Sequence, residues 1–220
     1  SERLTTLGTL AAEIAHEIRN PLMVVSLLFD SLKLDENSDD NQKKDLSIIR
    51  EKLDHLDQIA GRILDFGKSR EAFRKNLPLR EILEEAALLV RLKLEQSQVA
   101  LTINKGLPGL IVFVDKGQIQ QALLNLILNA LVAMPDGGEL TIEVMEPTDR
   151  KVSVLVKDTG QGIPDAFKDR IFDSFLTARS DGTGLGLTIS KRILRAHDGD
   201  LELLDSGPKG TVFRISLPIS

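Results

Sequence analysis

The apolar residues in the first part of the chain recur in alternating steps of three and four. In the first run they are Leu4, Leu7, Ala11, Ile14, Ile18, Pro21, Val25, Leu28 and Leu32, and in the second they are Leu46, Ile49, Leu53, Leu56, Ala60 and Ile63. This is the heptad spacing of helices that pack along a seam. Because the polar stretch 35–44 separates the runs, the pattern predicts a hairpin of two long helices. Two helices leave one side of each seam uncovered, which favours dimerisation into a four-helix bundle.

A different pattern begins near residue 78. It predicts a helix over 79–96, strands at 99–104 and 111–114, and a helix that opens at Asp115 with a capping box and ends before Pro135. Further strands are expected as a meander at 139–146, 151–157, 200–205 and 211–217, with a helix near 185–197. We therefore expect an α/β sandwich with a largely antiparallel or mixed sheet over 78–220, after a helical domain over 1–74.

Composition narrows the class of partner. The chain has 220 residues, no cysteine and a formal net charge of −5. These values exclude disulfides and thiolate metal sites, and they argue against binding nucleic acid through a basic surface. The longest apolar stretch, 122–133, contains two asparagines and is shorter than the roughly 20 residues that span a bilayer. Because the sequence starts at Ser-Glu-Arg without methionine, we expect a fragment of a longer protein, and membrane attachment of the parent, which stays open, would need segments absent from this fragment.

A histidine lies on the outer surface of the first predicted helix. In the heptad register set by Leu4 and Leu7, His16 falls at an f position and faces solvent. An exposed imidazole is largely neutral at its ordinary pKa of ~6.5, so one ring nitrogen is free to act as a nucleophile. The adjacent Glu17 can orient the ring and take up its proton. Pro21 removes the hydrogen bond to the Glu17 carbonyl and is expected to bend the helix beyond His16.

The predicted helix after Asp115 carries a stripe of amides, which are Gln118, Gln121, Asn125 and Asn129. At about 100° per residue these side chains share one face, opposite an apolar face. A solvated face normally carries glutamate and lysine, and asparagine is a poor helix former, so we interpret the stripe as functional. Amide oxygens are hard, neutral ligands suited to Mg²⁺, which keeps several waters and binds substrate phosphates. An ordinary solvated face is the alternative.

Two glycine clusters follow. The first, after a predicted strand, is Asp158-Thr-Gly160-Gln-Gly162, and the second, opening a predicted helix, is Gly182-Thr-Gly184-Leu-Gly186. Backbone N–H groups at a helix N-terminus bind phosphate oxygens. The Asp158 carboxylate can accept a hydrogen bond from an exocyclic amine such as that of adenine. Either cluster alone is compatible with simple turns, but the two together with the amide stripe indicate a nucleotide site.

These motifs, in this order, resemble those of the sensor histidine kinases of two-component signalling, and the resemblance covers essentially the whole chain. His16-Glu-Ile-Arg-Asn-Pro21 resembles the family's H box, whose histidine accepts the phosphoryl group, and Asn125-Leu-Ile-Leu-Asn129 resembles the N box. The two glycine clusters match the G1 and G2 boxes, and Phe172-Asp-Ser-Phe175 is similar to the F box between them.

The resemblance implies a dimerisation and phosphoacceptor domain over 1–74 and an ATP-binding domain of the Bergerat type over 78–220. It implies that Asn129 is the Mg²⁺ ligand, that Asp158 anchors the adenine, and that Asn125 and the five cluster glycines surround the nucleotide. Thr211 matches the threonine near the adenine. Many members carry a basic residue one turn after the metal-binding asparagine, a region that here holds Val132 and Ala133. Arg179 is therefore our candidate for the γ-phosphate cation, and a solvated charge is the alternative.

One position favours a kinase over a hydrolase. Related ATPases of the gyrase, Hsp90 and MutL type place a glutamate one turn before the metal-binding asparagine to activate water, and this chain has Asn125 there. Because an amide is not a general base, we expect the γ-phosphoryl group to be kept for the imidazole of His16. The segment from Glu17 to Asn20 also resembles kinases that dephosphorylate their partner regulator, in which the residue at Asn20 orients a water.

The sequence therefore predicts a cytoplasmic, homodimeric protein-histidine kinase. It would use ATP and Mg²⁺ to phosphorylate His16 and would pass the phosphoryl group to an aspartate on the receiver domain of a response regulator. Two alternatives stay open. The first is an ATP-driven conformational machine without phosphotransfer, against which Asn125 and the pair of His16 and Glu17 argue. The second is a dimeric scaffold with an inactive nucleotide site, against which Asn129, Asp158 and the glycines argue.

Overall fold

The chain divides into two compact units, Ser1–Arg70 and Glu71–Ser220. The computed structural model describes residues 22, 49, 53, 72–104, 106, 108–173 and 185–220. The predicted helical hairpin and its dimer seam therefore lie almost wholly outside the described residues. In the first unit, Leu22, Ile49 and Leu53 are described, and all three are helical. None of the helices in the described part of the chain is both long and apolar enough to cross a bilayer.

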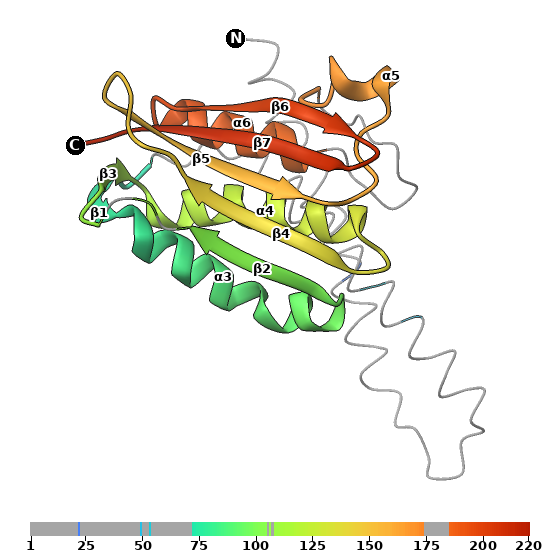
Figure 1. Cartoon of the computed structure of the whole chain (residues 1–220). Coiled ribbons are helices and arrows are strands. Elements are labelled where there is room, and N and C mark those ends of the chain that lie inside the picture. The colour runs from blue at the N-terminus through green and yellow to red at the C-terminus, as the bar shows by residue number, and fades with distance from the viewer. Residues whose placement is uncertain are drawn as a thin grey trace. The chain divides into compact units, whose positions relative to one another are not determined.

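A five-stranded mixed sheet forms the centre of the second unit (Figure 1). Across the sheet its strands are β2 (Val99–Asn104), β4 (Gly138–Val144), β5 (Lys151–Asp158), β7 (Gly210–Pro218) and β6 (Asp200–Gly207). β2 runs parallel to β4, and the other neighbouring strands are antiparallel. A separate antiparallel ribbon pairs β1 (Lys75–Pro78) with β3 (Ile111–Val114).

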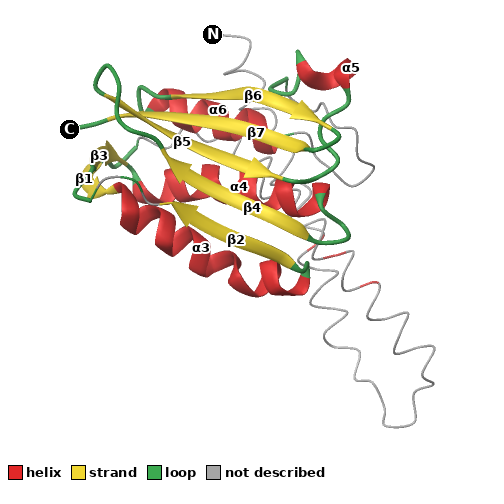
Figure 2. Ribbon diagram, in the orientation of Figure 1, coloured by secondary structure: helices red, strands yellow, loops and turns green. Residues whose placement is uncertain are grey.

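Three helices cover one face of this sheet (Figure 2). They are α3 (Leu79–Gln96), α4 (Lys116–Ala133) and α6 (Gly186–Ala196). Alternate strand residues, such as Val154 and Val156 on β5 and Ile215 on β7, are buried against the helices. Ile127 on α4 and Leu83 on α3 are fully buried in the same layer. This arrangement confirms the predicted α/β sandwich with a mixed sheet.

The start of α4 is fixed by its cap. The Oδ1 atom of Asp115 accepts a hydrogen bond from the Gln118 backbone N–H at 3.1 Å, as the sequence predicts. The backbone N–H of Asp115 donates to Nε2 of His197 at 3.0 Å, and Nδ1 of His197 lies 2.8 Å from the Ile193 carbonyl. His197 is completely buried. This histidine therefore joins the end of α6 to the start of α4, which is a structural role.

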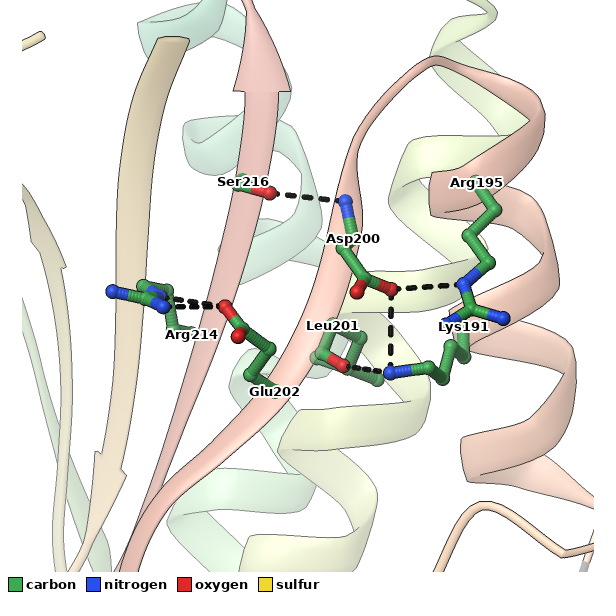
Figure 3. Close-up of polar contacts among 7 residues, drawn as sticks. All are labelled: Lys191, Arg195, Asp200, Leu201, Glu202, Arg214 and Ser216. Carbon is green, nitrogen blue, oxygen red and sulfur yellow. Dashed lines mark hydrogen bonds and ion pairs between the residues drawn. The ribbon is translucent and has the colours of Figure 1, made fainter. Parts of the chain in front are cut away.

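A polar cluster joins α6 to β6 (Figure 3). The Asp200 carboxylate accepts a hydrogen bond from Arg195 Nε at 3.1 Å and lies 3.3 Å from Lys191 Nζ. Lys191 also donates to the Leu201 carbonyl at 2.7 Å, and the Asp200 backbone N–H donates to Ser216 Oγ at 3.0 Å. These contacts to α6 and to Ser216 on β7 stabilise the short turn between α6 and β6.

The predicted meander is wrong in its last steps. The meander places the strand at 200–205 next to β5, but β5 pairs with β7, and β6 is the edge strand. Between β5 and β6 the chain passes through α6, which lies on the helical face of the sheet. β6 therefore forms the edge of the sheet, and β7, its hairpin partner, fills the position between β6 and β5. The strand predicted at 139–146 ends at Val144. β1 and α5 (Asp165–Lys168), which are four residues each, were not predicted.

Candidate functional site

Asp158 ends β5 on the helical face of the sheet. It continues the alternation of Val154 and Val156, and it lies opposite Thr211 on β7. Its Oδ1 atom accepts hydrogen bonds from the backbone N–H groups of Gly160 at 2.8 Å and Thr211 at 3.2 Å. Burial raises the pKa of the Asp158 carboxyl above its ordinary value, and these two N–H groups only partly offset that rise. Both bonds use the same oxygen, which leaves Oδ2 without a partner in the described part of the chain.

Two buried hydroxyl groups continue the site from Asp158 toward the next loop. The Thr211 hydroxyl lies 3.1 Å from the Ser206 hydroxyl. Ser206 Oγ also accepts a hydrogen bond from the Ile163 backbone N–H at 2.8 Å. Both residues are buried. The loop that follows Asp158 is therefore fastened to the end of the β6–β7 hairpin.

The glycines of this loop allow it to pack closely on both sides. A Cβ atom on Gly160 would lie 2.6 Å from the carbonyl oxygen of Ala133, which also accepts a hydrogen bond from Gln161 N–H at 3.0 Å. Gly162 has φ of 76°, and a Cβ there would lie 2.1 Å from the carbonyl oxygen of Gly207. The loop thus fits between the end of α4 and the hairpin only because these positions carry no side chain.

We expect Gly162→Ala to destabilise the second unit by roughly 2 kcal/mol or more, because it adds a backbone clash to a left-handed conformation. The matched control is Gly207→Ala on the other side of the same contact, where nothing lies within 4 Å of an added Cβ. Urea unfolding of both variants measures the difference. Equal midpoints for Gly162→Ala and the wild-type chain would contradict the described loop conformation.

The amide stripe of α4 lies beside this loop. The residues opposite it, Ile119, Leu123, Ile127 and Ala130, are buried, as predicted, and Asn125 and Asn129 are half-buried. Asn129 lies one turn before Ala133, whose carbonyl accepts the hydrogen bond from the glycine loop. No described residue is hydrogen-bonded to the Asn129 side-chain amide. The Asn125 side-chain nitrogen donates to the Gly186 carbonyl at 3.3 Å and to Ser190 Oγ at 3.2 Å.

α6 begins at Gly186, the last glycine of the second cluster. No side chain of the described residues caps this end, so backbone N–H groups of the first turn are open to an anion. Phe172 of the F box contacts side chains of α6. Thr188 donates to its carbonyl at 2.9 Å, and the Lys191 ammonium lies 4.2 Å from the centre of its ring.

The donor set fits magnesium rather than a transition metal. Among the residues that the structure describes, no group of three or more histidine, cysteine or acidic residues can hold a metal ion. Asn125 and Asn129 each supply one neutral amide oxygen on a half-buried helix face. Mg²⁺ suits such a site because it takes most of its ligands from water and phosphate.

A cavity of about 340 Å³ borders Asp158 on another side, lined by Asp205, residues 207–210 and Val212. Val212 and Asp205 pair with each other and alternate along their strands with the buried Thr211 and Ser206. Their side chains therefore lie on the opposite face of the sheet. This cavity is not part of the site on α4.

The structure brings together seven of the predicted nucleotide-site residues, namely Asn125, Asn129, Asp158, Gly160, Gly162, Gly186 and Thr211. The remaining predicted residues, His16, Glu17, Asn20, Arg179, Gly182 and Gly184, lie outside the described residues. Two serines in the site, Ser190 and Ser206, were not predicted, because a single serine on a helix or strand carries no motif.

Two sequence models of known domains match the chain. The model described as "Histidine kinase-, DNA gyrase B-, and HSP90-like ATPase" matches residues 114–220, and the "His Kinase A (phospho-acceptor) domain" matches residues 6–72. Signal transduction histidine-protein kinase AtoS of Escherichia coli (strain K12) is 31% identical over 100% of this chain, and sporulation kinase A of Bacillus subtilis (strain 168) is 33% identical over 99%. The chain spans 36% of the length of each of these two relatives.

Solved structures are similar as well. Full-length ShkA in complex with AMPPNP matches 96% of this chain and 45% of its own, with a TM-score of 0.80 and 25% identity. Histidine kinase ThkA in complex with response regulator protein TrrA matches 100% of this chain and 64% of its own, with a TM-score of 0.73 and 30% identity. The ThkA catalytic domain matches 66% of this chain and 97% of its own, with a TM-score of 0.60 and 31% identity. The chain belongs to the sensor histidine kinases of two-component systems.

Proposed function

We propose that this chain is an ATP-dependent protein-histidine kinase that phosphorylates His16 and passes the phosphoryl group to an aspartate of a response regulator. In this proposal residues 1–74 form the dimerisation and phosphoacceptor domain, and residues 78–220 bind ATP. The observation that carries it is the half-buried Asp158, whose Oδ2 has no partner among the described residues while Oδ1 is held by two backbone N–H groups. The same unit presents the asparagines of α4 and the start of α6.

Different residues of the site bind different parts of the nucleotide. Asp158 Oδ2 accepts a hydrogen bond from the exocyclic amine of adenine, and Thr211 holds the other oxygen in place. The first turn of α6 at Gly186 and the glycines 182 and 184 receive phosphate oxygens. Arg179 is the proposed cation on the γ-phosphate. The AMPPNP complex of the similar kinase ShkA supports ATP as the nucleotide.

Asn129 is the proposed Mg²⁺ ligand, and Asn125 lies one turn before it on the same face of α4. When bound, the metal neutralises charge on the phosphates and orients them for transfer. Asn125 cannot act as a general base, because an amide takes up no proton at neutral pH. The site therefore favours transfer to a side chain over transfer to water.

In the transfer step a ring nitrogen of His16 attacks the γ-phosphorus. A nitrogen–phosphorus bond forms, the bond to the oxygen that bridges the β- and γ-phosphates breaks, and ADP leaves. Glu17 takes up the proton of the other ring nitrogen, which keeps positive charge from building on the imidazole. A carboxylate oxygen of an aspartate of the regulator then attacks the same phosphorus. An oxygen–phosphorus bond forms, the nitrogen–phosphorus bond breaks, and the imidazole of His16 leaves and takes back its proton.

The match to the phosphoacceptor domain and the heptad pattern support a homodimer. The complex of the similar kinase ThkA with TrrA supports a receiver domain as the partner. Since the cell supplies ATP and Mg²⁺ in the cytoplasm, we propose a cytoplasmic location for this part of the protein.

The proposal is tested by the chemistry of the label that the chain takes from γ-labelled ATP with Mg²⁺. A phosphoramidate on histidine is lost in acid and survives alkali, whereas phosphate esters on serine or threonine survive acid. The proposal expects an acid-labile, alkali-stable label. An acid-stable label, or none while a nucleotide analogue still binds, would reject it.

We propose a second activity, dephosphorylation of the regulator, that depends on Asn20. We expect Asn20→Ala to lose dephosphorylation of the regulator while autophosphorylation continues, because the side-chain amide orients the attacking water and does not touch the ATP. The measurement follows release of phosphate from a phosphorylated receiver domain with ADP present. The matched control is Asn41→Ala in the polar stretch between the predicted helices, which should keep both activities. Unchanged dephosphorylation in Asn20→Ala would remove the second activity.

A further inference from the structure

Ser190 lies at the contact between the asparagine helix α4 and the first turn of α6. Its side chain is completely buried. Its Oγ lies 2.9 Å from the Gly186 carbonyl, one turn back on the same helix, and 3.2 Å from the Asn125 side-chain nitrogen. A serine hydroxyl has one proton and two lone pairs, so it donates to the carbonyl and accepts from the amide. All three groups are thereby joined in one small network.

This network fixes which way the Asn125 amide points. The Gly186 carbonyl only accepts hydrogen bonds, so the amide group that faces it at 3.3 Å is the nitrogen. The Ser190 oxygen beside it accepts from the same nitrogen. The amide oxygen of Asn125 is consequently turned away from these two acceptors, and no residue in the described ranges donates a hydrogen bond to it. A flipped amide would place two acceptors against each other.

We propose that Ser190 is a positioning residue that orients Asn125, so that the amide oxygen faces the metal and phosphate side of the site. It touches neither ATP nor metal and acts through the asparagine. Because only the oxygen of an amide can bind Mg²⁺ or a metal-bound water, loss of this orientation weakens the magnesium-dependent part of nucleotide binding. The inference rests on the proposed function, since Ser190 acts by orienting a residue of the proposed nucleotide site.

The test measures the affinity of the full chain for a non-hydrolysable ATP analogue with and without Mg²⁺, by calorimetry. We expect Ser190→Ala to weaken binding in Mg²⁺ by roughly three- to tenfold, the size of one hydrogen bond, and to leave binding in EDTA unchanged. Ser190→Thr retains the hydroxyl and should restore magnesium-dependent binding. The matched control is Ser216→Ala, which also removes one acceptor, here of the Asp200 backbone N–H at 3.0 Å, but outside the site (Figure 3).

A second variant separates orientation from general stability. If Ser190 acts through Asn125, then Ser190→Ala has no further effect on binding in a chain that already carries Asn125→Ala. Full additivity, or an equal loss with and without Mg²⁺, would overturn the inference. Failure of the wild-type chain to bind the analogue would instead reject the proposed function.

The orientation itself is measured in the nucleotide-free chain. The side-chain amide protons of Asn125 face two acceptors, so their exchange with solvent, followed by NMR, should be slow in the wild-type chain and faster in Ser190→Ala. Equal exchange rates in the two chains would overturn the inference whether or not ATP is the ligand.

Discussion

We expect His16→Gln to remove all acid-labile, alkali-stable label that the chain takes from γ-labelled ATP. Glutamine has no ring nitrogen with a free lone pair, so no nitrogen–phosphorus bond can form at this position. Nucleotide binding should be unchanged, because the residues of the proposed nucleotide site belong to the second unit, Glu71–Ser220, whereas His16 belongs to the first. The measurements are filter-bound label after alkali treatment and calorimetry with a non-hydrolysable ATP analogue.

The matched control for this variant is His55→Gln, which removes another histidine from the same predicted hairpin. It should retain the label. Label that remains in His16→Gln, or that disappears in His55→Gln, would move the phosphoacceptor away from His16. Loss of nucleotide binding together with the label would show only that the variant is misfolded, and far-ultraviolet circular dichroism separates that case.

The second large effect is expected at Asp158. Asp158→Asn keeps an oxygen for the Gly160 and Thr211 N–H groups but places an NH₂ group at the position of Oδ2. This group meets the exocyclic amine of adenine as donor against donor. We expect ATP affinity to fall by roughly 10- to 100-fold, the cost of a lost hydrogen bond to a charged group. Autophosphorylation should fall in parallel at low ATP.

The same substitution has the opposite effect on the fold. The pKa of Asp158 is raised in the folded chain by burial, so the folded state holds this proton more tightly than the unfolded chain does. Its contribution to stability is therefore present at low pH and is lost as the pH rises through the raised pKa. The side chain of Asp158→Asn does not ionise, so this variant does not lose that stability as the pH rises. At neutral pH it should unfold at the same denaturant concentration as the wild-type chain or at a higher one.

Calorimetry and urea unfolding across pH check both statements. In the wild-type chain nucleotide affinity should decline as the pH falls through the raised pKa of Asp158, whereas the affinity of Asp158→Asn should not change in that window. Asp205→Asn is the matched control, because Asp205 is exposed on the other face of the sheet. An Asp158→Asn chain that binds ATP normally would refute the adenine contact.

Much of the ATP-binding unit could be predicted from local patterns. α4 begins after Asp115 because that aspartate caps it, and it ends before Pro135, as the sequence predicts. The order of the last strands could not be predicted, since it depends on the path of α6 over the sheet. β1 was missed because four residues that end in a proline show no alternation.

The residues of the proposed nucleotide site could be singled out where chemistry imposes a motif. Asp158 and Gly162 are in this group because a carboxylate at a strand end and glycines in a tight loop form a recognisable string. The donor role of Asn125 and the presence of Ser190 were not found. They depend on a contact between two residues that lie 65 positions apart in sequence and on different helices, and a serine on a helix has no sequence signature.

In the proposed function the γ-phosphoryl group goes to the protein and not to water. The most direct measurement therefore follows the fate of γ-label in one reaction, as protein-bound phosphohistidine and as free phosphate, with Mg²⁺ and excess ATP. We expect label on the wild-type chain with little free phosphate, and neither product from His16→Gln. Steady release of free phosphate at the same rate from the wild-type chain and His16→Gln would contradict it and identify an ATP-hydrolysing machine.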